Sequence, residues 1–333
     1  MSRGIRKLLI AVASVPVLIA AAVAALVAVP PGRAPAPMES IRAPFVALDY
    51  SDLPPTQTVP ARDGLPLAYR YYPAAAPKVA VLVHGSSSNG KSMHALARGL
   101  AQQGVASVYA LDIRGHGESG PHGDIAYVGQ LEDDLADFAA WLRTRHAGAP
   151  LVLVGFSSGG GFVSRVAGGS SGSLFEGYLL VSPYLGYNAP TSRPYSEAPW
   201  AKADVPRIIG LGILSGIGIR AGQGLTVLQF AVAEGSRAQL TPEYSYRLMT
   251  NFASHPDYRD DFKRATKPMA VLVGSEDEVL YPERFPRAIA DAAAAVPVRV
   301  VSGVGHTGMI ADPRALAAVE AALRLLPTPD SSK

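Results

Sequence analysis

The residue types best suited to covalent chemistry lie in one glycine-flanked segment, Gly-Phe-Ser-Ser-Gly at 155–159. It follows an apolar run at 151–154 that is typical of a buried strand, and it precedes a small-residue run where a helix is expected to begin. A strand-to-helix turn this tight requires glycine, and it holds the serine oxygen above the sheet, beside the positive end of the helix. Gly-x-Ser-x-Gly also occurs in ordinary Gly/Ser-rich turns, so its flanking elements carry the interpretation. The pattern predicts Ser157 as a nucleophile.

A serine nucleophile needs a base and a group that orients the base, and position selects both. Among the seven histidines, His306 directly follows the last strand-like run, and Asp277 directly follows the run before it. Both residues therefore lie just beyond the carboxyl end of a strand, where open α/β sheets build their sites. Glu276 and Glu278 compete with Asp277 for the role of the acid. The chain order predicts a catalytic triad of Ser157, Asp277 and His306.

An oxyanion formed in acyl transfer needs two hydrogen-bond donors. The backbone N–H of Ser158, the residue after the nucleophile, is one expected donor. The turn after the apolar run 79–83 supplies the other, and we assign it to the backbone N–H of Ser86. Loss of one such donor typically costs about 10²–10³ in turnover.

Short apolar runs alternate with segments of helical spacing from about residue 57 onward. This alternation predicts an α/β fold with a mostly parallel sheet and helices on both of its faces. The expected strands are a hairpin over 56–72 and the runs 79–83, 105–112, 151–155, 178–181, 269–274 and 298–301, and the expected helices are 93–103, 131–145, 282–295 and 313–326.

The alternation breaks between residues 184 and 266, which indicates an inserted cap or lid. The core domain is therefore expected to comprise 38–183 and 267–333. The middle of the insertion, 208–219, is apolar and rich in glycine. Such a segment either packs on the core or forms an apolar wall for an acyl chain, in contact with a membrane surface.

The N-terminal region, 1–37, begins with basic residues and continues with an uncharged apolar run at 8–29. A run of this length spans a bilayer as a helix, and it is longer than the hydrophobic part of most signal peptides. We expect either a membrane anchor or a cleaved signal, followed by a Pro-rich spacer at 30–37. The catalytic domain then lies on the exported side of the inner (plasma) membrane, or is secreted or periplasmic after signal cleavage.

Composition excludes several classes of protein. The chain of 333 residues is 48% hydrophobic and 17% charged, with a net charge of +3, which argues against disorder. The absence of cysteine removes disulfides, cysteine-ligated metals, a thiolate nucleophile and lipoprotein anchoring. No long basic run points to nucleic acid, no histidine pair has metal-ligand spacing, and no cofactor is expected. Oligomeric state is left open.

Five motifs give the chain a resemblance to the α/β-hydrolase superfamily, within it to the group of monoacylglycerol lipases, lysophospholipases and serine aminopeptidases. The motifs are His84-Gly85, Asp-Ile-Arg-Gly-His-Gly-Glu-Ser at 112–119, the serine turn, Gly274-x-x-Asp277 and Gly305-His306. The resemblance covers roughly 57–326 and is weakest in the cap. It implies the α/β-hydrolase fold with an inserted cap, and structural roles for His84 and for 112–119. The Phe and Ser on either side of Ser157 depart from the His and Met that are more usual in the group.

The resemblance implies a serine hydrolase that cleaves carboxylic esters through an acyl-enzyme, with lysophospholipids or monoacylglycerols as first candidates. A small-ester esterase or an aminopeptidase of the same fold is the alternative. A catalytically inactive binding protein is another, because fold alone does not determine function. A fourth hypothesis is a nucleotide-binding P-loop, since Gly-x-x-x-x-Gly-Lys-Ser occurs at 85–92 after a strand and before a helix.

Overall fold

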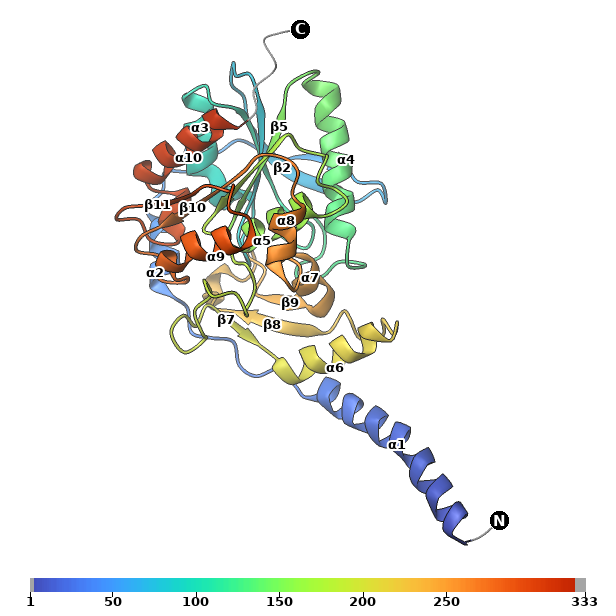
Figure 1. Ribbon diagram of the computed structural model, residues 1–333. Coiled ribbons are helices and arrows are strands. Elements are labelled where there is room, and N and C mark those ends of the chain that lie inside the picture. The colour runs from blue at the N-terminus through green and yellow to red at the C-terminus, as the bar shows by residue number, and fades with distance from the viewer. Residues whose placement is uncertain (1–2, 327–333) are drawn as a thin grey trace.

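The computed structural model describes residues 3–326, with residues 4 and 6–13 described by their backbone alone. The outer ends of the expected ranges, 1–2 and 327–333, lie outside the described residues. The described chain contains an eight-stranded sheet in the order β1-β2-β4-β3-β5-β6-β10-β11 (Figure 1). Neighbours pair in parallel except for β1 with β2 and β2 with β4. The strands are β1 (Gln57–Pro60), β2 (Pro66–Tyr72), β3 (Val79–Val83), β4 (Ser107–Leu111), β5 (Leu151–Phe156), β6 (Gly177–Val181), β10 (Met269–Gly274) and β11 (Val298–Val301).

Helices cover both faces of this sheet, as the alternation of elements predicts. Alternate residues of β3 belong to two different apolar clusters, so each face has its own core. One face packs against α3 (His94–Gln102) and α10 (Pro313–Leu325), and the other against α4 (Gln130–Arg145), α5 (Ser158–Gly168), α8 (Tyr258–Arg264) and α9 (Phe285–Ala292). Every residue of β3, β4, β5 and β6 is buried, which explains their continuous apolar sequences. The predicted α/β-hydrolase fold is confirmed.

Most boundaries agree with the sequence to within a few residues, and two helices begin differently. The expected hairpin is present and turns at 62–64, where Gly64 has a φ of 83° that glycine adopts without strain. The expected helices at 93–103 and 282–295 each follow a short 3₁₀ turn, η1 (Gly90–Met93) and η3 (Pro282–Arg284). The second helix ends at Ala292, before the apolar sequence does.

The interval 184–266 contains a second, antiparallel sheet that the sequence did not predict. Its strands are β7 (Ala201–Ala203), β8 (Thr226–Phe230) and β9 (Glu243–Ser245), accompanied by α6 (Val205–Gly216), η2 (Glu234–Ser236) and α7 (Tyr246–Asn251). The three strands lie beyond the carboxyl ends of the main sheet (Figure 1). The last helix of the interval, α8 (Tyr258–Arg264), packs closely against α5 of the core. The contact is so close that a Cβ at Gly168 of α5 would collide with the backbone of Asp261 in α8.

The N-terminal region contains two helices, α1 (Arg3–Ala28) and α2 (Glu39–Val46). The long helix α1 includes most of the apolar run and has Pro16 in its interior. Within residues 3–326, no helix satisfies the length and hydropathy expected of a membrane-crossing segment. The carboxyl end of α1 packs against α6, where Gly210 faces Val27 (Figure 1). The helix α2 lies in the range 38–183, which was expected to belong to the core domain. The sequence predicted no helix or strand there before residue 56.

The loop at 112–119 is held by buried polar contacts, in keeping with the structural role that the resemblance implies. Asp112 accepts hydrogen bonds from the backbone amides of Gly90 (2.6 Å) and Glu118 (2.9 Å). Arg114 forms two 2.7 Å hydrogen bonds with Asp134 of α4, and both side chains are about 95% buried. Burial raises the pKa of Asp134 despite the opposing effect of Arg114, so the carboxylate depends on this partner for its charge.

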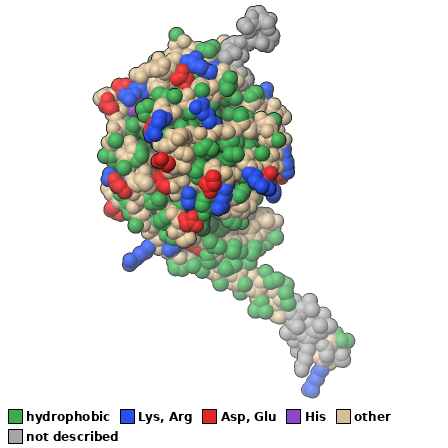
Figure 2. Space-filling view, turned by 60° about the vertical axis from the view of Figure 1, so that its left-hand side comes forward, with side chains coloured by type: hydrophobic (Ala, Val, Ile, Leu, Met, Phe, Trp, Pro, Cys, Tyr) green, Lys and Arg blue, Asp and Glu red, His purple; other side chains and the backbone are tan. Residues whose placement is uncertain are grey.

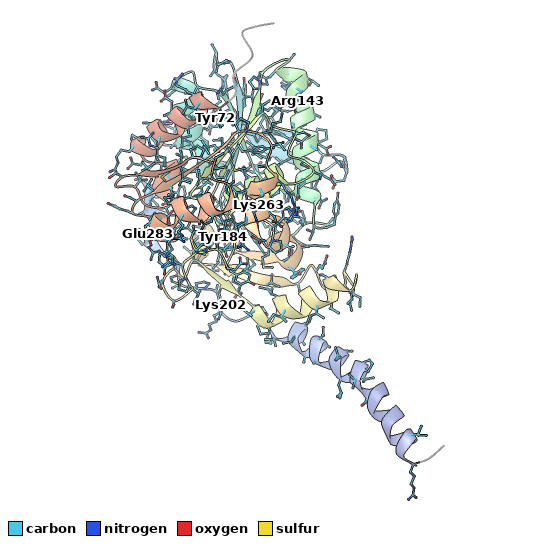
Figure 3. All side chains as sticks on the ribbon, viewed as in Figure 1. Tyr72, Arg143, Tyr184, Lys202, Lys263 and Glu283 are labelled. Carbon is cyan, nitrogen blue, oxygen red and sulfur yellow. The ribbon has the colours of Figure 1, made fainter. Side chains whose placement is uncertain are left out.

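We predict that Arg114→Met lowers the free energy of unfolding by about 3–5 kcal/mol, because it leaves the buried Asp134 without its cation. Urea unfolding monitored by circular dichroism measures the loss. The matched control is Arg143→Met, which removes an exposed partner of Glu176 on the outer side of α4 (Figure 3) and should cost less than about 1 kcal/mol. Equal losses in the two variants would contradict the prediction.

Candidate functional site

The turn at Ser157 has a strained backbone that its neighbours make possible. Ser157 has φ 54° and ψ −121°, which side-chain-bearing residues rarely adopt. A Cβ at Gly155 would collide with the carbonyl oxygen of Gly159, and one at Gly159 would collide with that of His84. Strand β5, helix α5 and the end of β3 therefore approach one another as closely as glycine permits. Ser157 is fixed there by a 3.0 Å hydrogen bond from its amide to the carbonyl of Val181.

The three residues predicted as a triad form one continuous hydrogen-bonded series. His306 Nε2 lies 3.0 Å from Ser157 Oγ, and His306 Nδ1 lies 2.8 Å from Asp277 Oδ2. All three are buried, with exposed fractions of 8% or less. Asp277 follows β10 and His306 follows β11. Because these two strands are parallel neighbours, their carboxyl ends place both residues at the same edge of the sheet as the serine. This geometry lets His306 take the serine proton while Asp277 fixes the imidazole.

The position of Asp277 separates it from the two competing glutamates. Its Oδ1 accepts hydrogen bonds from the amides of Val279 (3.0 Å) and Leu280 (2.8 Å), which leaves Oδ2 for the histidine. Glu278 instead accepts from the backbone amide of His306 at 2.9 Å. Glu278 therefore positions the histidine backbone, and the carboxylate on the imidazole belongs to Asp277.

The carboxylate and the imidazole change each other's pKa. Burial acts to raise the pKa of Asp277, but the charge and hydrogen bond of His306 outweigh it and hold this pKa below its ordinary value. Burial acts to lower the pKa of His306, and the charge of Asp277 outweighs it, so this pKa lies above its ordinary value. The pair thus favours the imidazolium that forms when the serine gives up its proton.

The two expected oxyanion donors belong to segments that lie next to Ser157. Ser158 is the first residue of α5, where backbone amides are not used within the helix. Ser86 follows β3, and a side chain on its neighbour Gly85 would contact Ser157. His84 Nδ1 binds the carbonyl of Gly85 at 2.8 Å. Because C=O and N–H point in opposite directions across a trans peptide, this bond turns the Ser86 amide away from His84.

The serine-rich loop after β3 is also held by residues in or just before strands of the second sheet, which sequence reasoning missed. Trp200 Nε1 donates to Ser86 Oγ at 2.8 Å, and Tyr244 Oη accepts from the amide of Ser87 at 2.7 Å. The amide of Thr241 donates to the carbonyl of Ser87, which has a φ of 65°. No local motif marks these residues, because their role depends only on where the second sheet is placed.

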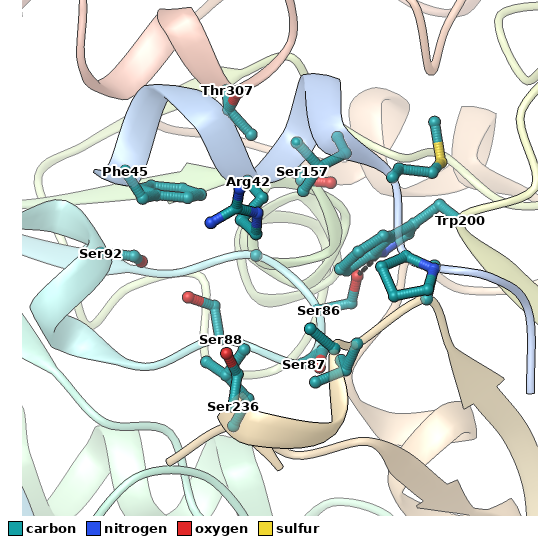
Figure 4. A pocket seen from close by; sticks show the side chains of 18 of the residues that line it. Arg42, Phe45, Ser86, Ser87, Ser88, Ser92, Ser157, Trp200, Ser236 and Thr307 are labelled. Carbon is teal, nitrogen blue, oxygen red and sulfur yellow. Dashed lines mark hydrogen bonds between the residues drawn. The ribbon is translucent and has the colours of Figure 1, made fainter. Parts of the chain in front are cut away.

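A pocket of about 550 Å³ opens over Ser157 and His306, a size typical of small-molecule sites. Figure 4 shows its wall, with Trp200 beside Ser86 and with Arg42 and Phe45 on a helix near Thr307. Its lining includes two cationic side chains, Arg42 and Lys91, beside His306, and no Asp or Glu of the described residues lines it. The pocket combines a mostly apolar wall with the hydrogen-bonded series at its floor.

The P-loop hypothesis meets a direct obstacle in the segment 85–92. A phosphate cradle needs free backbone amides, yet the amide of Gly90 is bound to Asp112 and that of Ser87 to Tyr244. Lys91 lies over the ring of Tyr50, at 4.7 Å from its centre. The geometry therefore favours the oxyanion role of this loop. Within residues 3–326, no cluster of three or more His, Asp or Glu side chains is arranged to hold a metal ion.

Residues 74–220 match the protein family described as serine aminopeptidase, S33. A monoacylglycerol lipase of Mycolicibacterium smegmatis is 33% identical over 119 residues, which cover 32% of this chain and 41% of that protein. The match thus spans about two fifths of that relative's length. The structure resembles a soluble variant of monoglyceride lipase from Saccharomyces cerevisiae (TM-score 0.60, 19% identity, 89% of this chain, all of the other). It also resembles a Paleococcus ferrophilus monoacylglycerol lipase (TM-score 0.54, 19% identity, 77% and 98% covered).

A fluorophosphonate reacts only with an activated serine. We predict that the labelling of Ser157 is lost as the pH falls through the pKa of His306, which lies above the ordinary histidine value of about 6.5. The reason is that His306 accepts the serine proton only when it is neutral. Asp277→Asn removes the charge that raises this pKa, so the acid limb moves to lower pH while the rate falls by about 10⁴. Labelling rates between about pH 5 and pH 9 measure both effects. An unshifted acid limb in Asp277→Asn would contradict the assignment.

Proposed function

We propose that this chain, which has the α/β-hydrolase fold, is a serine hydrolase that cleaves carboxylic esters through an acyl-enzyme. The observation that carries the proposal is the hydrogen-bonded series from Ser157 through His306 to Asp277 at the floor of an apolar pocket. A nucleophile, a base and a group that orients the base in this geometry are the requirements for acyl transfer.

The proposed mechanism uses only residues of this chain. His306 takes the proton of Ser157 as its Oγ attacks the ester carbonyl, and Asp277 stabilises the imidazolium. The amides of Ser86 and Ser158 stabilise the oxyanion. His306 returns the proton to the leaving alcohol, and the acyl group stays on Ser157. Water activated by the same imidazole then attacks the acyl-enzyme and releases the acid.

The lining of the pocket supports an ester with an apolar acyl group. Phe45, Phe156, Trp200, Val232 and Leu240 provide apolar surface near the serine. Burial of a chain on such surface contributes about 0.8 kcal/mol per methylene. The relatives described as monoacylglycerol lipases support the same class. Lysophospholipids or monoacylglycerols are therefore the proposed substrates, with small esters as the alternative.

An aminopeptidase activity has less support from the pocket. Recognition of a free amino terminus requires an acidic partner, and no carboxylate of the described residues lines this cavity. The lining also lacks the acidic side chains Glu118, Glu197, Asp204 and Glu234. Arg42 and Lys91 would instead repel an ammonium group. These charges favour a neutral or anionic substrate.

We also propose that the apolar run 8–29 attaches the protein to a membrane, with the catalytic domain on the exported side. The proposal rests on the sequence and on an adjoining apolar surface. The helix α6 exposes Val205, Ile209 and Ile213, each four residues from the next and therefore on one face, and Ile217 directly after the helix is exposed too. Figure 2 shows hydrophobic side chains continuing from α1 onto the neighbouring surface of the main body.

The catalytic proposal predicts that a fluorophosphonate labels the wild-type protein and that Ser157→Ala abolishes the labelling. Ser158→Ala keeps its backbone amide and serves as the matched control, which should still be labelled. Hydrolysis of acetyl, octanoyl and hexadecanoyl esters, beside aminoacyl amides, then measures the substrate class. Equal labelling of wild type and Ser157→Ala would exclude the serine mechanism, and faster hydrolysis of the amides would favour the peptidase.

The membrane proposal predicts that the mature protein retains residues 8–29 and floats with phosphatidylglycerol-containing vesicles in a density gradient. Leu18→Arg places a charge on an exposed apolar position of α1 and should reduce flotation, because charge is costly in the bilayer. Leu325→Arg, on an exposed position of α10, is the matched control. An intact mass that lacks residues 8–29 would establish a cleaved signal instead.

A further inference from the structure

The helix α2 lies at the active-site pocket although it belongs neither to the main sheet's layers nor to the second sheet. Met38, Ile41 and Phe45 line the same cavity as Ser157 and His306. Ile41 and Phe45 are four residues apart on the helix, and Met38 is its N-cap, so one face of this short helix and the residue before it are directed into the pocket. Figure 4 shows Phe45 and Arg42 on this helix near Thr307, the residue after the histidine.

The contacts of α2 place it close to the reacting groups. Thr307 Oγ1 donates to the carbonyl of Ser40 at 3.3 Å, which joins α2 to the residue beside His306. Phe45 is half-buried and packs against the apolar cluster between the sheet and the helices α3 and α10. Ala43, by contrast, is exposed on the outer side of the helix.

Tertiary contacts, rather than the helix itself, hold α2 in this position. It has eight residues, contains Pro44, and has no side-chain cap at Met38, so it is too short to be stable alone. After the helix, Asp52 binds Arg98 (2.9 Å) and His94 (3.2 Å), and Tyr50 stacks on His94. These bonds fix the carboxyl side of the segment to α3.

The other side of the segment is fixed to the second sheet and its helix. The Arg207 guanidinium of α6 donates to the carbonyls of Val27 and Val29, at the end of α1. Beyond them, Gly32 lies against the side chain of Lys202 on β7, a residue that Figure 3 shows at this end of the molecule. The chain between these two attachments is therefore held across the pocket.

We propose that α2 is the substrate-selecting wall of the active-site pocket and that Ile41 and Phe45 bind the acyl chain beyond its first carbons. This inference rests on the proposed ester hydrolysis and extends it, because it assigns chain-length preference to the N-terminal segment rather than to the inserted cap alone. In this proposal an acetyl group occupies only the part of the cavity beside Ser157, whereas a long acyl chain extends along the cavity and needs apolar surface there.

The test uses the full-length protein in detergent, with Ile41→Ala and Phe45→Ala as variants and Ala43→Ser as the matched control on the outer face. The measurement is kcat/KM for acetyl and dodecanoyl esters. Each variant should lower the ratio of dodecanoyl to acetyl kcat/KM by about tenfold, mainly through a higher KM, because the contact binds ground state and transition state alike. The control should keep the wild-type ratio.

A parallel measurement compares labelling of Ser157 by fluorophosphonates that carry an ethyl or a dodecyl chain. A lower dodecyl preference in Phe45→Ala, with ethyl labelling unchanged, supports the inference. An unchanged preference overturns it, as does an equal loss for both probes, which would show that α2 only stabilises the fold. If neither probe labels the wild-type protein, the proposed hydrolase function fails and the inference fails with it.

Discussion

The backbone of Ser157 is the constraint on which the rest of the site depends. A residue held at φ 54° and ψ −121° costs on the order of 1–3 kcal/mol, and it persists only where the surroundings leave no alternative. Here the surroundings are two buried strands and a helix that meet at glycines, where any larger residue would clash with carbonyl oxygens. The buried parallel sheet therefore maintains the strain. Its result is a serine oxygen that faces the histidine and a helix N-terminus that faces the developing charge.

The second sheet acts on the chemistry through the loop that it holds. Trp200 and Tyr244 bind successive residues of the serine-rich loop, and Tyr244 also contacts His116 from the buried loop at 112–119. The expected oxyanion donor Ser86 is thus fixed by His84 on the core side and by Trp200 on the other. Ser87, which has an unusual φ, is held there by two hydrogen bonds from the inserted interval, one with the hydroxyl of Tyr244 and one from the amide of Thr241. This gives the interval 184–266 a positioning role in addition to covering the pocket.

The N-terminal region contains both the proposed membrane attachment, at residues 8–29, and the proposed wall of the pocket, at α2. The segment after α1 is bound to α6 through Arg207 and to α3 through Asp52, and between them it passes the pocket. If residues 8–29 attach the chain to a membrane, the segment that follows them in the sequence forms the wall of the pocket at α2. The apolar face of α6 beside α1 extends the same surface. An acyl substrate would then remain on apolar surface as it moves from the bilayer toward the serine.

Local sequence determined those features that depend on neighbouring residues: the buried strands, the glycine-flanked turn at Ser157, and the acid and base that follow strands β10 and β11. Periodicity and turn chemistry act over a few residues, so these patterns can be recognised without a fold. The sequence left Glu276, Asp277 and Glu278 as competing acids, and the structure brings only Asp277 to the imidazole. The second sheet, Trp200, Tyr244 and the placement of α2 escaped prediction. Their strands and helix are short, and their roles arise from contacts across up to 267 positions of the chain, so only tertiary packing decided them.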